Sequence, residues 1–291
     1  MESKNILITG ASGNIGAEII RGLKEIKSPH QIFTGVFNIE KSKQALSSYD
    51  NLQFSRLDFT NPLTFDKALE NIDIVFLLRP PQLADVPRYF APFTSAMKQK
   101  GISKIVFLSV QGVENQKFIP HYKLEKLIVD EGFDYVFLRP SYFMQNLTTT
   151  LVHEIKTENK IFIPSGKLKF NWVDARDIGF VGAHILNDFD KFKNKPYEIT
   201  GSEFEGFEKV AQILTKVLGK TIRYESPNLM KFFNSKRKLG ISKPMIFVMI
   251  MLHYLPRFGK NLTQLTNTVK EITGRQPGTI AEFVEREKRK F

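Results

Sequence analysis

The sequence predicts an α/β protein built around a doubly wound parallel sheet, and three observations support this fold class. Short apolar runs alternate with helix-like stretches through the first half of the chain. A glycine-rich turn joins the first apolar run to the first helix-like stretch. The apolar runs are nearly continuous, as in parallel strands that are covered by helices on both faces. Right-handed crossovers between such strands produce a doubly wound sheet.

The elements of the first half follow one another in strict alternation. The first strand is predicted at 4–9, and the helix that follows at 15–26 carries Ile and Leu at helical spacing. Later strands are predicted at 31–37, 52–57, 73–78, 104–109 and 134–140. Helices are predicted at 86–101 and 121–132, and each ends at a Gly that serves as a stop signal.

The second half is less regular. It contains predicted strands near 160–166, 196–200 and 221–226, a strand end that runs into a helix over 171–186, and a helix near 207–219. The strand at 196–200 is expected to return to the main sheet. We therefore predict a nucleotide-binding domain over 1–150 and a smaller C-terminal α+β substrate lobe over 151–291.

Composition excludes several kinds of site. The chain of 291 residues contains no Cys, so it has no disulfide, zinc–thiolate site or thiol nucleophile. The five His residues are far apart in the sequence, and we predict no metal site. The apolar run near the N-terminus begins after only four residues, which does not fit a secretion signal, and we expect a cytoplasmic protein.

The net charge of +12 raises the question of an acidic partner. The lysines are scattered and are dense only at 235–238 and 285–290, so we expect no nucleic-acid partner. A positive field also favours an anionic cofactor or substrate. The apolar stretch 244–255 is shorter than the roughly 18–20 residues of a membrane-spanning helix. We predict a buried helix or a pocket lid there, no membrane partner, and a small-molecule substrate; the oligomeric state stays open.

The glycine-rich turn is the strongest functional signal. Gly10, Gly13 and Gly16 stand between the first strand and the first helix with the spacing G-x-x-G-x-x-G. The first Gly permits the tight turn, the second lets backbone N–H groups approach a pyrophosphate, and the third lets the helix pack closely. The helix N-terminus adds partial positive charge. This arrangement predicts a Rossmann-type NAD(P) site that also includes Ser12, Asn14 and Ile15.

The end of the second strand bears on the choice between NAD and NADP. An acidic residue in this place holds the ribose hydroxyls and favours NAD. Here Asn38 takes that place, Glu40 comes later, and Lys41 and Lys43 follow. We therefore favour NADP over NAD, with Asn38 and Lys41 as cofactor contacts. The alternative is that these lysines only start a solvated helix.

The spacing of the glycines resembles that of the extended and atypical short-chain dehydrogenases/reductases. VFLLRPP (75–81), KIVFLSVQG (104–112), FDYVFLRPSYFMQNL (133–147) and WVDARDIG (172–179), in this order, resemble the NmrA-like branch. That branch contains quinone and triphenylmethane-dye reductases, and regulators that bind the dinucleotide without turnover. Its members are related to putative nucleoside-diphosphate-sugar epimerases.

The resemblance also implies cofactor contacts at the ends of the later strands. Asp58 and Phe59 correspond to a pair that touches the adenine, although DFTNP is equally a good turn. The other predicted contacts follow the fourth, fifth and sixth strands: Leu78, Arg79, Pro80, Ser109, Pro140, Tyr142 and Phe143.

The resemblance also bears on the catalytic residues. Related enzymes use a Tyr, a Lys four residues later and a Ser on the fifth strand; the Lys lowers the Tyr pKa, and the Tyr protonates the developing alkoxide. Ser109 is present. Tyr122 and Lys126 have the right spacing, but counting back from GFDY puts Glu125 in register with a family Glu and His121 in the Lys position. We therefore predict His121, with Ser109, as the catalytic or cofactor-binding groups.

A site without a Tyr acid suits an acceptor that takes a hydride easily. We expect an NAD(P)H-dependent reductase of a quinone-like or other flat conjugated acceptor. The alternatives are a redox-sensing regulator that binds NAD(P) without turnover, and an epimerase-like enzyme.

Overall fold

The computed structural model describes residues 2–259 and 264–291. The chain divides into two compact units. Unit 1 contains the residues up to Pro140 together with Ala175–Ile199 and Thr266–Gln276. Unit 2 contains Ser141–Asp174, Thr200–Leu265 and Pro277–Phe291. Each unit has its own hydrophobic core.

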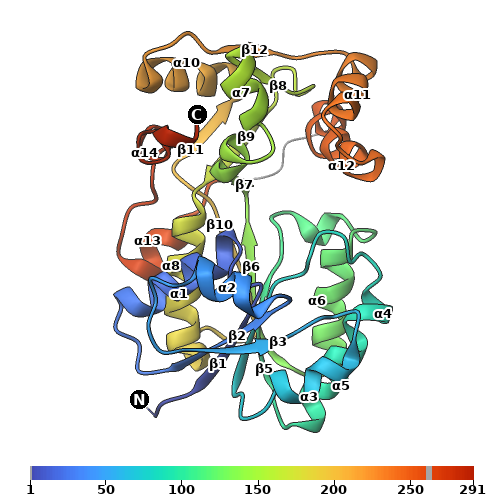
Figure 1. Cartoon of the computed structure of the whole chain (residues 1–291), viewed down its shortest axis with the longest axis vertical. Coiled ribbons are helices and arrows are strands. Elements are labelled where there is room, and N and C mark those ends of the chain that lie inside the picture. Colours follow the sequence, from blue (N-terminus) through green and yellow to red (C-terminus); the bar gives the residue numbers. More distant parts are fainter. Residues whose placement is uncertain (1, 260–263) are drawn as a thin grey trace. The chain divides into compact units, whose positions relative to one another are not determined.

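Unit 1 is built on a seven-stranded parallel sheet with the strand order β10-β6-β5-β4-β1-β2-β3 (Figure 1). The strands are β1 (Asn5–Thr9), β2 (Gln31–Val36), β3 (Leu52–Arg56), β4 (Ile74–Leu77), β5 (Lys104–Leu108), β6 (Asp134–Pro140) and β10 (Lys195–Ile199). The order reverses at β1, as in a doubly wound sheet. The predicted fold class is therefore confirmed, and the strand expected at 196–200 does return to this sheet.

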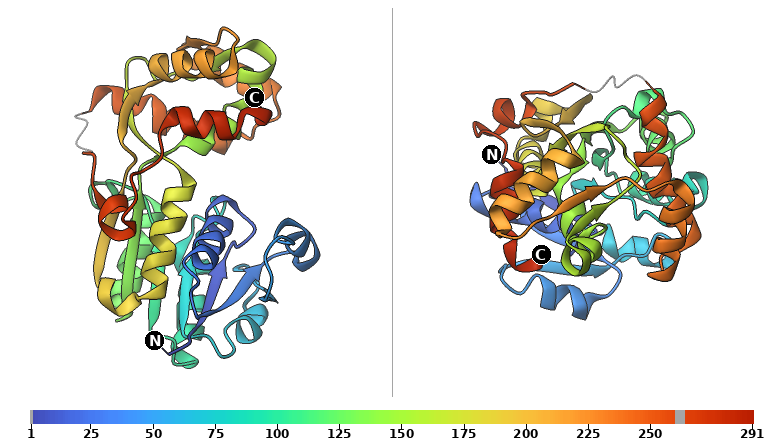
Figure 2. Two further views of the ribbon diagram at one scale, coloured as in Figure 1. Left: turned by 90° about the vertical axis from the view of Figure 1, so that its left-hand side faces the viewer. Right: turned by 90° about the horizontal axis from the view of Figure 1, so that it is seen from above.

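Helices cover both faces of the sheet. One face packs against α3 (Phe65–Ala68), α4 (Val86–Tyr89), α5 (Ala91–Gln99) and α6 (Pro120–Asp130). On the other face, α1 (Asn14–Glu25) lies directly against α8 (Ala175–Asn187), a pairing that can be followed in Figure 2. The shorter helices are α2 (Ile39–Ala45), α9 (Phe189–Phe192) and α13 (Thr268–Thr273).

The close contact of α1 and α8 depends on glycines. A Cβ atom at Gly179 would come within 2.5 Å of Glu18, and one at Gly22 within 2.7 Å of the Ala183 Cβ. Side chains larger than hydrogen would force the helices apart. The helix that follows the glycine turn is thus fixed in place by small residues on both partners.

The helix predicted at 86–101 is interrupted. It forms α4 and α5, which are separated at Phe90. Pro92 has no N–H to donate to the carbonyl four residues earlier, so a continuous helix is disfavoured there. The uninterrupted helix was a wrong prediction, and the proline two residues after the break explains it.

Unit 2 combines two small sheets with helices. One sheet has the order β11-β9-β7, and the other pairs β12 with β8. The strands are β7 (Tyr142–Phe143), β8 (Lys160–Phe162), β9 (Lys169–Val173), β11 (Glu203–Gly206) and β12 (Arg223–Glu225). The helices are α7 (Val152–Glu158), α10 (Phe207–Leu218), α11 (Leu229–Lys238), α12 (Lys243–His253) and α14 (Ile280–Arg286).

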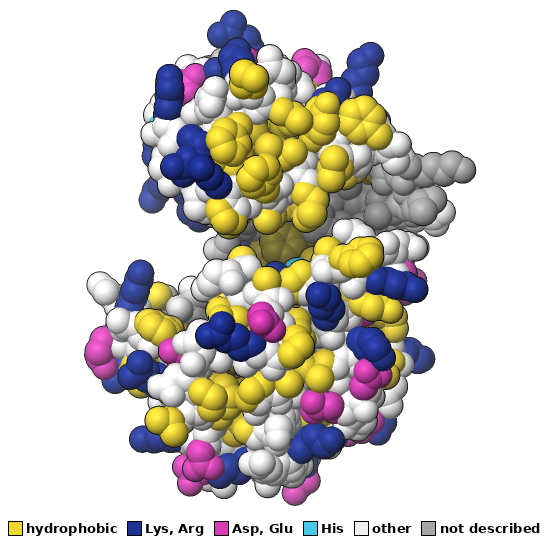
Figure 3. All heavy atoms as spheres, turned by 90° about the vertical axis from the view of Figure 1, so that its right-hand side faces the viewer, with side chains coloured by type: hydrophobic (Ala, Val, Ile, Leu, Met, Phe, Trp, Pro, Cys, Tyr) yellow, Lys and Arg dark blue, Asp and Glu magenta, His cyan; other side chains and the backbone are white. Residues whose placement is uncertain are grey.

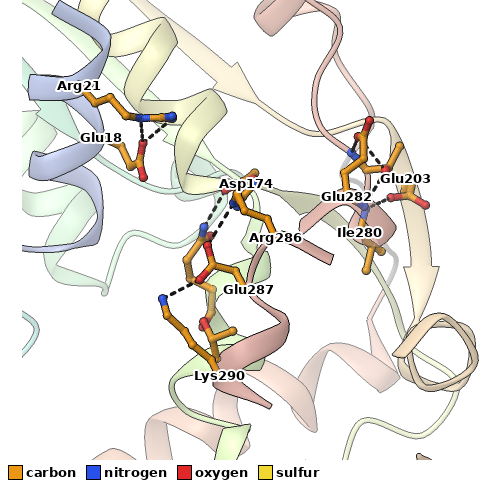
Figure 4. A network of polar contacts seen from close by, with 12 residues as sticks. Glu18, Arg21, Asp174, Glu203, Ile280, Glu282, Arg286, Glu287 and Lys290 are labelled. Carbon is orange, nitrogen blue, oxygen red and sulfur yellow. Dashed lines mark hydrogen bonds and ion pairs between the residues drawn. The ribbon is translucent and has the colours of Figure 1, made fainter. Parts of the chain in front are cut away.

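Ion pairs join the distant segments of unit 2. Arg286 on α14 donates to Asp174, which follows β9, at 2.6 Å (Figure 4). Glu287 then pairs with Lys290 at 2.7 Å. Lys236 on α11 and Glu154 on α7 form a fully buried ion pair. Such a pair is costly to break from one side, because the remaining charge stays buried.

The apolar stretch 244–255 lies mostly in α12. Its buried residues are Ile246, Met249 and His253, whereas Phe247 is 61% exposed. The prediction of a buried helix therefore holds for one side of α12 only. Within residues 2–259 and 264–291, no helix is both long and apolar enough to cross a bilayer.

Candidate functional site: the carboxyl edge of the unit 1 sheet

The glycine turn has the geometry that its sequence predicts. Gly10 has a φ of +62°, in the left-handed region that favours glycine. A Cβ atom at Gly16 would lie 2.5 Å from the Gly10 carbonyl oxygen, so a larger residue there would push the helix away from the turn. The turn is tied to its neighbours by two bonds. The Gly10 N–H donates to the Gly35 carbonyl, and the Leu78 N–H donates to the Thr9 hydroxyl.

The start of α1 carries no side-chain cap. Its N-cap is Gly13, with an extended backbone, and its first turn contains no acidic residue. Ser12, Gly13 and Asn14 are all exposed, and Ile15 is buried beneath them. The first N–H groups of a helix need an external partner, and the helix dipole favours an anion. This end of α1 is therefore suited to a pyrophosphate.

The start of α2 lies beside the glycine turn, since the Ser42 hydroxyl donates to the Ser12 hydroxyl at 3.2 Å. Asn38 caps α2, with its side-chain oxygen accepting from the Lys41 N–H at 2.9 Å. This leaves the two N–H donors of the Asn38 amide for a ligand. Lys41 is exposed, and Glu40 pairs with Lys43 at 3.2 Å.

Two residues that the sequence reasoning missed lie at the same corner. Phe37 follows β2 and is 69% exposed, and the guanidinium of Arg56, the last residue of β3, lies 6.0 Å from its ring centre. Pairing of β2 with β3 brings them together, because Val36 is in register with Arg56. The sequence signal that could have pointed to this corner is the aromatic residue at the end of the predicted second strand.

Asp58 and Phe59 have clear structural roles. The Asp58 carboxylate accepts from the Thr60 N–H at 2.9 Å and from its hydroxyl at 2.7 Å, so it closes a turn. The Phe59 ring is buried and lies 5.0 Å from the ring of Phe90 and 5.1 Å from that of Phe93. The turn interpretation therefore describes these side chains in the structure, and contact with adenine stays a prediction.

Arg79 organises the loop after β4. One of its terminal nitrogens donates to the carbonyls of Pro80, Pro81 and Leu83, all within 3.1 Å. Its Nε is buried without a hydrogen-bond partner among the described residues. Burial lowers the pKa of Arg79 from its usual value. Leu78, just before it, contacts the glycine turn, because a Cβ at Gly10 would meet the Leu78 side chain at 3.3 Å.

His121 lies in the first turn of α6. Its ring is stacked on Phe107 of β5, with 6.2 Å between the ring centres. Burial, and then the charge of Arg79, lower its pKa to about 3. His121 is therefore neutral at physiological pH. A neutral imidazole donates a hydrogen bond at one nitrogen and accepts one at the other.

The rest of α6 supports the register that was counted from GFDY. Glu125 is 6% exposed and forms a bidentate ion pair with Arg139 of β6, at 3.0 and 2.7 Å. Lys126, the next residue, is exposed and pairs with Asp130 at 2.7 Å. His121 and Glu125 thus share the inward face of α6, while the ammonium group of Lys126 is held on the outer face.

Ser109 follows β5 and is 2% exposed. Its N–H donates to the Leu138 carbonyl at 2.7 Å, and its hydroxyl has no hydrogen-bond partner among the described residues. A buried hydroxyl without a partner costs free energy, about 1–3 kcal/mol. Ser109, Arg79 and the open start of α1 all belong to loops at the carboxyl ends of unit 1 strands. These groups fit the needs of a nicotinamide dinucleotide, which offers phosphates, ribose hydroxyls and an amide.

Tyr142 and Phe143 were also predicted to contact the cofactor. Both belong to unit 2, where they form β7 directly after Pro140, the last residue of β6. The Tyr142 ring packs against Trp172 at 4.8 Å and Phe170 at 4.6 Å. Burial raises the pKa of Tyr142. Their contact with a cofactor stays a prediction.

His253 is a further unit 2 residue that the sequence reasoning missed. Its Nε2 lies 2.8 Å from the Tyr142 hydroxyl, and its Nδ1 lies 2.7 Å from the Met249 carbonyl. A carbonyl only accepts, so Nδ1 carries the proton and Nε2 accepts from the Tyr142 hydroxyl. Burial, in the first place, lowers the pKa of His253 to about 4. Nothing in the sequence links these two distant residues.

A surface hollow of about 300 Å³ occurs elsewhere in unit 1, between α1, α8 and α13. Two of the arginines that line it already have acidic partners. Arg21 pairs with Glu18 at 2.6 Å, and Arg275 pairs with Glu25 at 2.9 Å. Its position away from the strand ends separates it from the candidate site. No group of three or more potential metal ligands occurs within the described ranges of the chain.

Comparison with known proteins agrees with this geometry. The chain is 31% identical to the prestalk A differentiation protein A of Dictyostelium discoideum over 279 residues, 96% of this chain and 91% of that protein. It is 27% identical to the NAD(P)H azoreductase of Xenophilus azovorans, over 96% of each chain. The triphenylmethane reductase of a Citrobacter species, solved in complex with NADP(H), superimposes with a TM-score of 0.83 at 20% identity, covering 97% of this chain and 99% of that one. The NmrA-like family matches residues 2–277, and the chain belongs to that family.

Proposed function

We propose that this protein is an NAD(P)H-dependent reductase that acts on a flat conjugated acceptor, such as a quinone or a dye. The observation that carries the proposal is the uncapped start of α1, which follows the left-handed turn at Gly10. Membership of the NmrA-like family, with an azoreductase among the relatives, supports oxidoreductase chemistry.

In this proposal, different residues at the sheet edge bind different parts of the cofactor. The glycine turn and the first N–H groups of α1 bind the pyrophosphate. Asn38 and Lys41 face the adenosine ribose. Ser109 and His121 supply hydrogen bonds near the nicotinamide ribose, since both belong to loops or helix starts after β5. The bound nicotinamide would supply the hydride.

The state of His121 limits the acceptor. With a pKa of about 3, the His121 imidazole is deprotonated at pH 7, so it has no imidazolium proton to give to the substrate. The Lys126 ammonium is held in an ion pair with Asp130 at 2.7 Å, on a side chain that is 61% exposed. A conjugated acceptor needs less help, because its reduced form is delocalised and takes its proton from water. Reduction of a quinone then consumes one hydride and one proton.

The same features disfavour an epimerase. Oxidation of a sugar hydroxyl needs a strong base in contact with it. Of the titratable side chains of α6, Glu125 is buried but engaged by Arg139, and His121, which is half-buried on Phe107, is only weakly basic. A regulator that binds the cofactor without turnover is the second candidate. The absence of a protonated His121 at neutral pH favours it, because a regulator needs no proton donor.

The cofactor preference that we propose is NADPH. Asn38 replaces the acidic residue that would repel a 2′-phosphate. Lys41, in the first turn of α2, and Arg56, the last residue of β3, are both exposed. A cation within about 4 Å of a phosphate at the protein surface contributes on the order of 1 kcal/mol or more. Lys41→Ala and Arg56→Ala are each expected to weaken NADPH binding several-fold and to leave NADH binding unchanged.

One experiment tests the function. NADPH and NADH binding is measured by calorimetry, and cofactor oxidation is followed by absorbance with a panel of quinones, azo dyes and triphenylmethane dyes. Binding with oxidation by at least one acceptor supports the reductase. Binding without oxidation across the panel supports the regulator, and absence of binding rejects both.

A further inference from the structure

The outward side of the α11–α12 hairpin is an apolar surface on unit 2. Nine large apolar side chains at least 38% exposed stand on it and on the turn after it: Met230, Leu239, Met245, Phe247, Val248, Met251, Leu252, Leu255 and Phe258. Figure 3 shows hydrophobic side chains gathered over these helices in its upper part. We call this set the hairpin surface. Apolar surface gathered in this way marks an interaction site in a soluble fold.

The helices that carry the hairpin surface are packed against unit 2 by their other sides. The opposite side of α12 is firmly held, with Ile246, Met249 and His253 in the unit 2 core. The neighbouring helix α11 is fixed through Phe232 and through the buried ion pair of Lys236 with Glu154. The apolar side chains are therefore presented to solvent by a rigid support.

The charged side chains that the hairpin and the turn after it contribute are all basic. The sequence from Ser226 to Lys270 contains no Asp or Glu. Arg237, Lys238, Lys243 and Arg257 are exposed at the ends of α11 and α12 and in the turn after α12. An apolar surface with basic residues at its margins matches the interface of a bilayer that contains anionic lipids.

From this geometry and charge we infer that the hairpin surface docks on the surface of an anionic membrane. The apolar side chains enter the boundary between headgroups and acyl chains, and the four cations contact lipid phosphates and carboxylates. Helix α12 is too short to cross a bilayer, but docking on the membrane surface does not require a helix that crosses it. A second copy of the chain fits less well, because two hairpin surfaces would bring eight exposed cations together without any acid from these helices.

The test uses the full chain and co-sedimentation with vesicles. Vesicles of phosphatidylcholine alone are compared with vesicles containing roughly one third phosphatidylserine, a charge density typical of anionic leaflets. We expect binding to the second kind only, and weaker binding near 1 M salt, where the Debye length falls to about 3 Å.

Two pairs of variants locate the contact. Phe247→Ser with Met251→Ser removes apolar surface and is expected to lower vesicle binding about tenfold or more. Leu63→Ser, at a 90% exposed position of unit 1, is the matched control and should bind as the parent does. Lys243→Glu is expected to lower binding to anionic vesicles about tenfold. Its control is Lys67→Glu on α3.

The outcomes decide the inference. Retained NADPH binding and an unchanged circular dichroism spectrum show that the variants are folded. No sedimentation with anionic vesicles, or equal losses in the control variants, overturns the proposal. A dimer in light scattering that the Phe247→Ser, Met251→Ser double variant converts to monomer also overturns it, in favour of a second copy as the occupant.

Discussion

Two helices of unit 1 begin after strands of the same sheet. Neither has a side-chain cap or an acidic residue in its first turn, but they differ in the side chains at the helix start. Helix α1 starts at an exposed glycine with no cap and no nearby acid, so its N–H groups are open to a ligand. Helix α6 starts at Pro120, and its first turn places His121 on Phe107 beside Arg79. The start of α1 has a glycine at its N-cap, which leaves the backbone N–H groups accessible. The start of α6 is surrounded by the side chains of Phe107 and Arg79. Sequence therefore predicts the binding role of α1 more directly than the chemical role of α6.

The largest expected effect concerns the start of α1. Gly13→Asp places a carboxylate at the N-cap, where it caps the helix and occupies the anion position. We expect NADPH affinity to fall about a hundredfold or more, roughly 3 kcal/mol, with a melting temperature equal to or slightly above that of the parent. Calorimetry and thermal denaturation measure the two quantities. If the melting temperature fell together with the NADPH affinity, the loss of binding would reflect unfolding, and the anion-binding role of the α1 start would not be supported.

The next effect concerns the support of α6. Glu125→Gln leaves Arg139 largely buried, and Glu114, at 3.0 Å, is then its remaining ion-pair partner among the described residues. We expect a loss of about 2–3 kcal/mol in the free energy of unfolding, measured with urea. Glu114→Gln, at an exposed position, is the control and should cost less than about 1 kcal/mol. Equal costs for both variants would show that Glu125 does not anchor α6.

The pH dependence tests the state of His121. Its pKa of about 3 lies below the ordinary 6.5, so the neutral form predominates above pH 3 and protonation requires a fall toward that value. If the protein turns over a quinone, kcat/KM should show no inflection from His121 between pH 5 and 8. Profiles of the parent and of His121→Gln should have the same shape. An inflection near pH 6.5 that the variant lacks would show that His121 acts as an acid.

The smallest effects belong to Tyr122 and Lys126 of α6. Tyr122→Phe and Lys126→Ala are expected to change kcat/KM by less than about twofold, because the register counted from GFDY puts neither residue in a catalytic position. The Lys126 ammonium is also paired with Asp130 near the surface, where such pairs contribute little. Steady-state kinetics with the best acceptor provides the measurement. A loss of turnover in Tyr122→Phe would show that the register counted from GFDY is wrong.

The sequence predicted the parts of the fold that local patterns determine. The central strands β1, β4, β5 and β6 carry apolar runs, and Gly10 and Gly16 have the strict spatial requirements that their spacing indicated. Counting from GFDY put Glu125 in register with a family Glu, and the structure shows this side chain buried against Arg139. The pKa of His121 could not be predicted, because it depends on Arg79 and Phe107, which come from other strands.

Unit 2 shows where pattern reasoning fails. Its strands are two to five residues long, and their partners lie far away in the sequence, as in the pairing of Glu203 with Trp172. The contact of Tyr142 with His253 joins residues 111 positions apart. The apolar run in α12 predicted burial, but hydrophobicity alone does not tell which side of a helix the core covers.

The division of the chain between the units also has a consequence for how the protein folds during synthesis. Unit 1 needs α13 (Thr268–Thr273), which packs on α8, and unit 2 needs α14 (Ile280–Arg286), which packs on α10. Each of these two helices is synthesised after the helix that it packs against. Neither unit can reach its final set of contacts before its later helix is made, so a nascent chain waits with an exposed α8 and α10. Contacts between distant segments form slowly, and the waiting period is when such a chain is most dependent on chaperones.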